Sequence, residues 1–267
     1  MICFYHSADL DGLCSAAIVK GWNPDAKLHP INYGEMFPWQ LIRQSEDVFM
    51  VDFCLQPFTA MMTLNGMCQK YGNNFHWIDH HKTSIENAKK NEFMTTGNQI
   101  LETGSAACEL TWEYLYPAID IPRGVWLLGR YDVWDLDADE YIYPFQMGMR
   151  SMDIDPESPV WESIFSDCMD IMDDVCRDGE TIVNYQTKTN KKICKATSYP
   201  TEFEGLKCIA SNNPLCNSQT FESVWDPEEY DAMLDCIPLY RQTRHRRIRN
   251  RQKTRRRRPQ TSRRFPM

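Results

Sequence analysis

FHWIDHHK, at residues 75–82, joins an apolar run typical of a strand to an aspartate and two adjacent histidines. Of two earlier apolar runs, Met1–His6 (MICFYH) ends in a histidine and Asp47–Phe53 (DVFMVDF) carries Asp52 next to its end. Each of these two is followed by a segment with helical periodicity, at Leu13–Trp22 and Pro57–Tyr71. Runs this uniformly apolar are typical of parallel strands covered by helices on both faces. The sequence therefore predicts an α/β fold with a parallel sheet flanked by helices.

From Gly104 onward the pattern becomes helical. GSAACELTWEYLY, at residues 104–116, places Ser105 where a helix N-cap is expected. Further helices are predicted at Pro122–Arg130 and through the polar stretch from about Ser158 to Lys195. FEGLKCIAS, at Phe203–Ser211, has a glycine turn between two strand-like runs, which is typical of a hairpin. This hairpin is expected to belong to a partial second α/β domain.

The chain is expected to divide into four segments. These are a main domain at residues 1–157, a connecting helical region at 158–195, a partial C-terminal domain at 196–240 and an Arg-rich disordered tail at 241–267. The tail holds 13 Lys and Arg residues and no Asp or Glu, which leaves 16 basic against 37 acidic residues in the rest of the chain. Because residues 1–240 are acidic and the tail is basic, the charge of each part must be explained separately. The tail is a candidate for non-specific contact with RNA or DNA.

The cysteine pattern indicates whether the protein works under reducing or oxidising conditions. Eleven cysteines are scattered without a C-x-x-C pair, and the opening MICFYH lacks the charged and apolar regions of a signal peptide. A reduced, cytoplasmic protein is expected. No apolar run approaches the roughly 18 residues of a membrane span, so no membrane partner is expected.

Acidic and histidine residues follow each of the three predicted strands. Because the carboxyl ends of parallel strands line one edge of a sheet, these residues should meet in space. They are His6, Asp9 and Asp11 after the first strand, Asp52 at the end of the second, and Asp79, His80 and His81 at the end of the third. A fourth contribution is expected from Asp132 in GRYDVWD, with Asp135 as the alternative.

This set of side chains is typical of a divalent metal site. Carboxylate oxygens and imidazole nitrogens without a thiolate favour Mn²⁺ or a similar ion over structural zinc. Crowded carboxylates repel one another unless cations lie between them, and two cations would satisfy this number of carboxylates. Two such ions can clamp a phosphoryl group and activate a water at neutral pH. The sequence therefore predicts two Mn²⁺ ions, with Mg²⁺ and Co²⁺ as alternatives.

Five short motifs, in order, resemble those of the DHH phosphoesterases. They are HSADLDG at residues 6–12, VDF around Asp52, DHHK at Asp79–Lys82, GSAAC at Gly104–Cys108 and YDVW around Asp132. A lone D-H-H tripeptide is a weak signal, whereas five elements in order are a strong one. The resemblance covers roughly residues 1–135 with motifs and continues as a pattern-level likeness to about residue 231.

The resemblance implies a role for each of these residues. His6 and Asp9 would hold one Mn²⁺. Asp11, His80 and Asp132 would hold the other. Asp52 would bridge the two ions. His81 would face the substrate phosphate, and Asp79 would orient a histidine through its second ring nitrogen. The gap between His6 and Asp9 is two residues, where related patterns show one or three.

The function implied is metal-dependent hydrolysis of phosphodiester or phosphomonoester bonds in short oligonucleotides or nucleotides. The likeness is to the RecJ-like and oligoribonuclease-like branch, whose second domain carries a glycine- and histidine-rich substrate loop. No such loop follows YDAML at residues 230–234. Two alternatives stay open. One is a nucleotide phosphatase or pyrophosphatase, and the other is a non-catalytic nucleic-acid-binding protein that acts through the Arg-rich tail.

Overall fold

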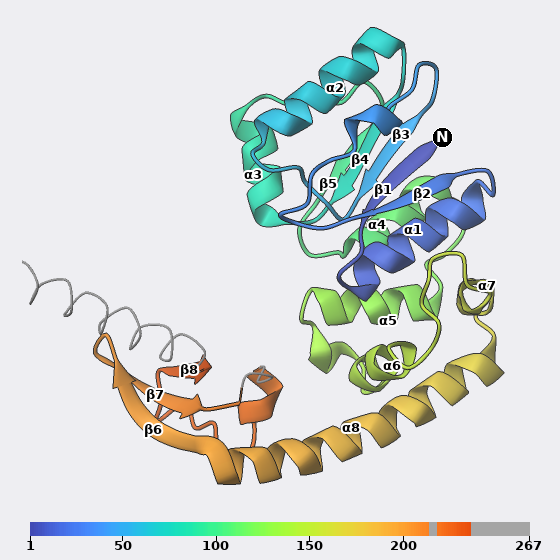
Figure 1. Cartoon of the computed structure of the whole chain (residues 1–267). Coiled ribbons are helices and arrows are strands. Elements are labelled where there is room, and N and C mark those ends of the chain that lie inside the picture. Colours follow the sequence, from blue (N-terminus) through green and yellow to red (C-terminus); the bar gives the residue numbers. More distant parts are fainter. Residues whose placement is uncertain (214–217, 236–267) are drawn as a thin grey trace, which may run out of the picture. The chain divides into compact units, whose positions relative to one another are not determined.

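The structure is a computed structural model that describes residues 1–213 and 218–235. Five strands form a parallel sheet in the order β2-β1-β3-β4-β5 (Figure 1). Their bounds are β1 Ile2–His6, β2 Lys27–Ile31, β3 Val48–Val51, β4 Phe75–Asp79 and β5 Gln99–Leu101. The predicted parallel α/β sheet is confirmed. The predicted Arg-rich tail at residues 241–267 lies outside the described residues.

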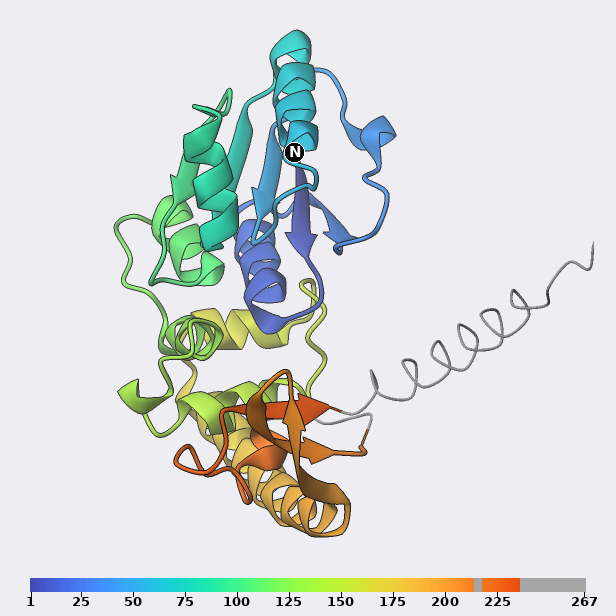
Figure 2. The same cartoon turned by 90° about the vertical axis from the view of Figure 1, so that its left-hand side faces the viewer.

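Both faces of the sheet are apolar because successive side chains of a strand point to opposite sides. One row of register partners, Phe4, Met50 and Trp77, belongs to the core under α2 (Thr59–Tyr71) and α3 (Lys82–Lys90). The neighbouring row of Tyr5, Val51 and Ile78 packs with α1 (Leu10–Trp22) and α4 (Ala107–Leu115). Figures 1 and 2 show these helix pairs on the two sides of the sheet. The uniformly apolar strands are thus explained by burial on both faces.

A second core joins α1 to the helices that follow α4. These are α5 (Arg123–Asp132), α6 (Ile142–Met149), α7 (Val160–Phe165) and the start of α8 (Met169–Thr197). Ala16 and Val19 of α1 contact the sheet core, whereas Ala17 and Ile18 contact the helical core. Because α1 is shared by both cores, it fixes α5 relative to the sheet. Short 3-10 turns lie at Trp39–Leu41, Leu136–Ala138 and Ser218–Phe221.

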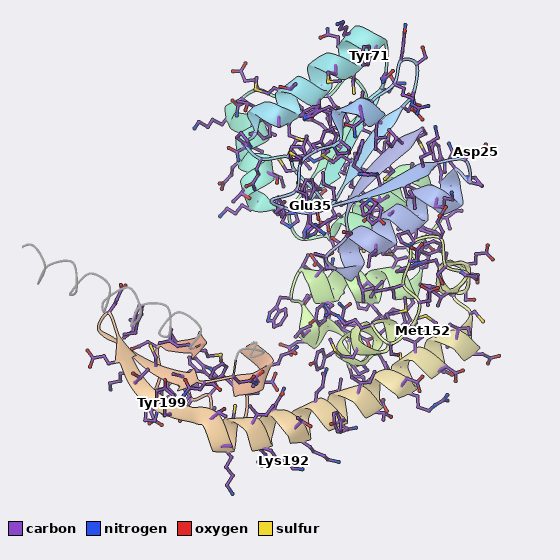
Figure 3. All side chains as sticks on the ribbon, viewed as in Figure 1. Asp25, Glu35, Tyr71, Met152, Lys192 and Tyr199 are labelled. Carbon is purple, nitrogen blue, oxygen red and sulfur yellow. The ribbon has the colours of Figure 1, made fainter. Side chains whose placement is uncertain are left out.

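The described residues form two compact units, one of residues 1–183 and one from Asn184 onward, and the boundary falls within α8. In the second unit, β6 (Ser198–Phe203) pairs antiparallel with β7 (Leu206–Ser211), which pairs with β8 (Ala232–Asp235). The predicted hairpin is confirmed, and its turn has positive φ at Glu204 (51°) and Gly205 (86°), as a type I′ turn requires. Figure 3 labels Lys192 on α8 and Tyr199 on β6. The domain divisions expected from the sequence stay predictions.

Four elements of the first unit were missed from the sequence, namely β2, β5, α3 and α6. β2 is an edge strand that contains Pro30, and an edge strand is one of the few places in a sheet that tolerate proline. β5 has three residues, and α3 is largely polar with buried Ser84, Ile85 and Ala88 on one side. Weak apolar periodicity hides elements of this kind. None of the helices in the described residues is long and apolar enough to cross a membrane.

Candidate metal centre

The strand order locates a crevice at one edge of the sheet. β1 lies between β2 and β3, so the connections from β1 and from β3 run in opposite directions along the sheet. Open α/β sheets bind ligands at such a switch point, outside the carboxyl ends of the strands. His6 ends β1, Asp52 directly follows β3, and Asp79 ends β4. The predicted residues therefore come from the strands that border the crevice.

His80 lies at the centre of three carboxylates. Its Nε2 atom is 3.5 Å from Asp11 Oδ2, 3.4 Å from Asp52 Oδ1 and 3.1 Å from Asp132 Oδ2. Two sets of three ligand atoms lie within 4.8 Å of one another: Asp11, His80 and Asp132, and Asp52, His80 and His81. Side chains from α1, the end of β3, the end of β4 and the end of α5 thus converge on one point. Such a mixture of oxygen and nitrogen ligands fits a divalent cation.

Asp52 is the residue of this cluster whose surroundings best fit a bound cation. The residue is 1% exposed, and neither carboxylate oxygen has a hydrogen-bond partner. Burial raises the pKa of this carboxyl well above its usual range, and the charges of Asp11, Asp9, Asp132 and Asp79 raise it further. Its φ of +54° lies in the left-handed region, a strain that typically occurs at functional sites. A buried carboxylate without donors is satisfied by metal coordination.

Asp11 has a second task that the sequence did not reveal. Its Oδ2 and Oδ1 atoms accept hydrogen bonds from the backbone amides of Ala107 at 2.9 Å and Cys108 at 2.7 Å. These are the first two amides of α4, which have no acceptor within the helix. The N-cap residue is Ala106, whose own amide donates to Glu109 Oε2 at 2.9 Å. The prediction of Ser105 as the cap was wrong, because the capping oxygens come from a distant segment of the chain.

We expect Asp11→Ala to lower the free energy of unfolding of the metal-free protein by about 1–3 kcal/mol, because two buried amides lose their acceptor. Ser105→Ala should change it by less than about 0.5 kcal/mol, because Ser105 is only half-buried and does not cap α4. Urea unfolding in the presence of a chelator measures both values without any contribution from bound cations. Equal costs for the two variants would contradict the assignment of Asp11 as the cap.

Asp79 orients His81 rather than His80. Asp79 is fully buried, and its Oδ1 atom is 2.7 Å from His81 Nδ1 and accepts the backbone amide of His81 at 3.1 Å. The hydrogen bond with Asp79 raises the pKa of the His81 imidazole, although burial opposes this. The side chain of His81 is 38% exposed. With Nδ1 occupied, Nε2 is the ring atom left for another molecule.

His6 and Asp9 form a separate pair. His6 Nε2 is 3.5 Å from Asp9 Oδ2, while Asp9 Oδ1 caps α1 by accepting the Gly12 amide at 3.1 Å. A Cβ atom at Gly12 would lie 1.9 Å from the His6 carbonyl oxygen, so only glycine lets α1 begin this close to the end of β1. His6 Nδ1 is buried without a partner. In the described part of the chain, the closely spaced ligand sets around His80 contain neither His6 nor Asp9.

Asp132 and Asp135 lie in different surroundings. Asp132 contacts His80, and its pKa is raised to about 8 by burial and then by the charges of Asp11 and Asp9. Asp135 is 3.5 Å from Arg130 Nη1, and Arg130 Nη2 lies 2.5 Å from Glu109 Oε2. The structure thus brings Asp132 into the group. The pair of Arg130 and Glu109, which ties α5 to the start of α4, was missed because nothing in the local sequence joins these two residues.

Comparisons with known proteins give distant likenesses. No protein-family model matches the chain. An uncharacterized protein of Acanthamoeba polyphaga mimivirus is 27% identical over 184 residues, which cover 67% of this chain and 39% of that protein. The chain therefore spans about two fifths of the length of this curated relative.

Two solved structures are also similar to the chain. One is an uncharacterized protein from Helicobacter pylori G27, with 15% identity and a TM-score of 0.46, covering 88% of this chain and 81% of that chain. The other is the DHH domain of a member of the s1p family of ribosomal proteins, with 14% identity and a TM-score of 0.46, covering 81% and 64%.

Proposed function

We propose that this chain is a DHH-type phosphoric ester hydrolase that works with two divalent cations, Mn²⁺ foremost, on short oligonucleotides or nucleotides. The observation that carries the proposal is the buried Asp52 carboxylate, whose two oxygens have no hydrogen-bond partner. Asp52 Oδ1 lies 3.4 Å from His80 Nε2, and the Asp52 carboxylate is close enough to Asp9 for their charges to interact. A carboxylate in this position is suited to bridging two ions.

The residues divide between the two ions in a simple way. Asp11, His80 and Asp132 would hold one cation, His6 and Asp9 the other, and Asp52 both. When bound, the cations would polarise the phosphate ester and lower the pKa of an attacking water. Mg²⁺ and Co²⁺ are alternatives to Mn²⁺ because the ligands are oxygens and imidazole nitrogens.

His81 would act on the substrate from the open side of the centre. Asp79 fixes the ring and raises the pKa of the imidazole, so the protonated form is favoured. The free Nε2–H can then donate to a phosphate oxygen as negative charge develops there. A positioned donor of this kind stabilises a transition state because it needs no reorganisation.

We expect His81→Gln to lower kcat by about 100- to 1,000-fold, the scale for losing one donor at a developing oxyanion. His29→Gln is the control, because His29 lies on β2 and contacts Phe4 rather than the centre. Steady-state rates with saturating Mn²⁺ measure both variants. Similar kcat values for His81→Gln and the unaltered protein would show that His81 does not touch the reacting phosphate.

The proposed reaction is tested by incubating the full chain with Mn²⁺, Mg²⁺, Co²⁺ or a chelator. Substrates are dinucleotides, mononucleotides and inorganic pyrophosphate, and release of product is followed by chromatography. The proposal expects metal-dependent cleavage of dinucleotides or mononucleotides. Cleavage of pyrophosphate alone would favour the pyrophosphatase alternative. Absence of hydrolysis of every substrate with every metal would refute an enzymatic role.

A further inference from the structure

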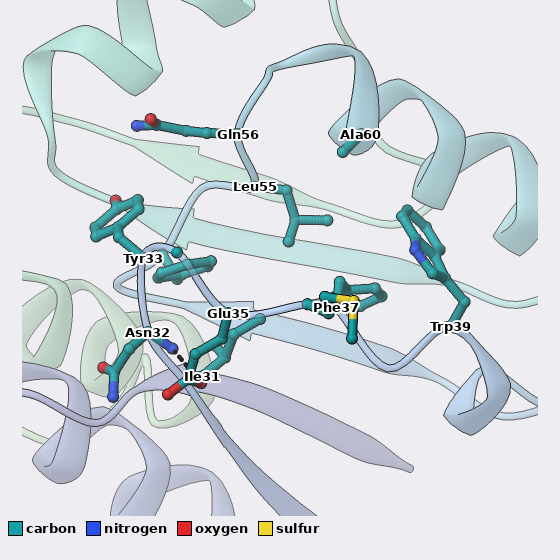
Figure 4. Close-up of a pocket in the computed structure, with 12 residues that line it drawn as sticks. Ile31, Asn32, Tyr33, Glu35, Phe37, Trp39, Leu55, Gln56 and Ala60 are labelled. Carbon is teal, nitrogen blue, oxygen red and sulfur yellow. Dashed lines mark hydrogen bonds between the residues drawn. The ribbon is translucent and has the colours of Figure 1, made fainter.

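A cavity of about 380 Å³ lies beside the metal centre. It is formed by the loop after β2, the segment after β3 and the start of α2, and its wall includes Tyr33, Phe37, Trp39, Phe53, Leu55 and Gln56 (Figure 4). Its volume falls in the range of about 300–1,000 Å³ typical of small-molecule sites. None of the residues assigned to the cations lines it. The function proposed above therefore leaves this cavity unexplained.

Aromatic rings dominate the wall. The rings of Tyr33 and Phe53 are 4.5 Å apart with an interplanar angle of 31°, and those of Phe37 and Trp39 are 4.7 Å apart at 69°. Tyr33 is 45% exposed, so part of its side chain is open to another molecule. In Figure 4 the labelled rings of Tyr33 and Trp39 lie on different sides of Leu55. A flat apolar group would find stacking partners here.

Two contacts connect the cavity to the metal centre. Phe53 directly follows Asp52 in the chain, and the His6 ring lies 5.5 Å from that of Tyr33 and 5.8 Å from that of Phe53. The Tyr33 hydroxyl also lies within electrostatic reach of the centre. Burial raises its pKa to about 12, and the negative charge of Asp79 contributes to this rise. A ligand in the cavity would therefore be next to a phosphate at the centre.

The polar groups of the wall are suited to a neutral heterocycle rather than a phosphate. Among the described residues that line the cavity there is no lysine or arginine, and Glu35 contributes a carboxylate. Glu35 lies on the loop between β2 and β3, and its carboxylate accepts a hydrogen bond from the backbone amide of Asn32 at 3.1 Å (Figure 4). Asn32 and Gln56 add amides that can pair with the edge of a base.

We propose that this cavity, the Tyr33 pocket, binds the nucleobase of the substrate, stacked on the exposed Tyr33 ring that packs against the buried Phe53, while the adjoining phosphate occupies the metal centre. The inference rests on the proposed function and deepens it, because it makes the substrate a nucleotide rather than pyrophosphate or a simple phosphate ester. Stacking on aromatic side chains accepts any base, since every base has a π face. Selectivity among bases would come from Asn32 and Gln56.

The test compares two substrates of the full chain with Mn²⁺, a dinucleotide and its abasic counterpart. Tyr33→Ala should lower the ratio of their kcat/KM values by about 10- to 100-fold, the scale of one lost base stack, mainly through a higher KM for the dinucleotide. Tyr33→Phe keeps the ring and should keep the ratio. Tyr185→Ala, at a 71% exposed tyrosine of α8, is the matched control and should also keep it.

An unchanged ratio in Tyr33→Ala, with an unaltered unfolding midpoint, would overturn the inference. If the unaltered chain hydrolyses neither substrate, the proposed function fails, and the pocket is then judged by binding alone. Equilibrium dialysis of a nucleoside, which carries the base without a phosphate, against metal-free protein serves this purpose. Binding that Tyr33→Ala weakens at least about 10-fold would support the pocket, and equal or absent binding would overturn it.

Discussion

Asp52→Asn is expected to lower the rate of phosphate ester hydrolysis at least about a hundredfold, the scale seen when a metal-site group is lost. The protein should bind fewer than two Mn²⁺ per chain. Asparagine keeps the shape of the side chain but removes the charge, so two cations would face each other with one anion fewer between them. Steady-state rates and a Mn²⁺ titration of the same preparation measure the two effects together.

The fold should survive this substitution. Asparagine tolerates the left-handed φ of +54° found at this position, and a neutral amide avoids burying a charge. The control is Asp47→Asn, at the opposite end of β3, where the carboxylate accepts a hydrogen bond from Asn74 at 3.0 Å. It should keep both ions and the rate. Near-normal turnover of Asp52→Asn with two bound ions would mean that the catalytic centre lies elsewhere.

The inner part of the sheet could be predicted because its sequence signal and its structure have the same physical cause. β1, β3 and β4 are covered on both faces, so they are apolar throughout and stand out from the chain. β2 and β5 are the edge strands, and their partly exposed side chains leave a mixed pattern. The sequence also predicted that the acidic and histidine residues after the inner strands lie close together. This follows because the carboxyl ends of parallel strands share one edge of the sheet.

Contacts between distant segments could not be predicted in this way. The capping of α4 by Asp11 spans about a hundred positions of sequence, so the local sequence favours Ser105, the nearest residue of capping type, instead. The Tyr33 pocket depends on how an irregular loop folds back over Phe53, and no periodicity records that. Sequence pattern thus predicted that Asp11, Asp52, His80 and Asp132 come together, but neither the contacts that support these side chains nor the cavity beside them.

Metal-free protein should lose stability as the pH rises from about 5.5 to 7.5. The Asp132 carboxyl has a pKa near 8 in the folded protein, against about 3.9 in an unfolded chain. A raised pKa means that the folded state binds the proton more tightly, so the stabilisation is complete below about pH 4 and is lost as the pH rises towards 8. The pKa values of Asp52 and His81 are also raised, which gives the same direction.

Mn²⁺ should reverse this loss, because a cation takes the place of the proton. At a free concentration about a hundredfold above Kd, one site contributes about 2.7 kcal/mol, or roughly 5–10 °C in the unfolding midpoint of a domain this size. The rise in the unfolding midpoint that Mn²⁺ produces should grow with pH. Asp132→Asn should lose a large part of it, whereas Asp135→Asn should keep it, because Asp135 pairs with Arg130 instead. The measurement is thermal unfolding with and without Mn²⁺ at pH 5.5 and pH 7.5. A rise in midpoint that does not change with pH, or one that only Asp135→Asn removes, would contradict a cation site at Asp132.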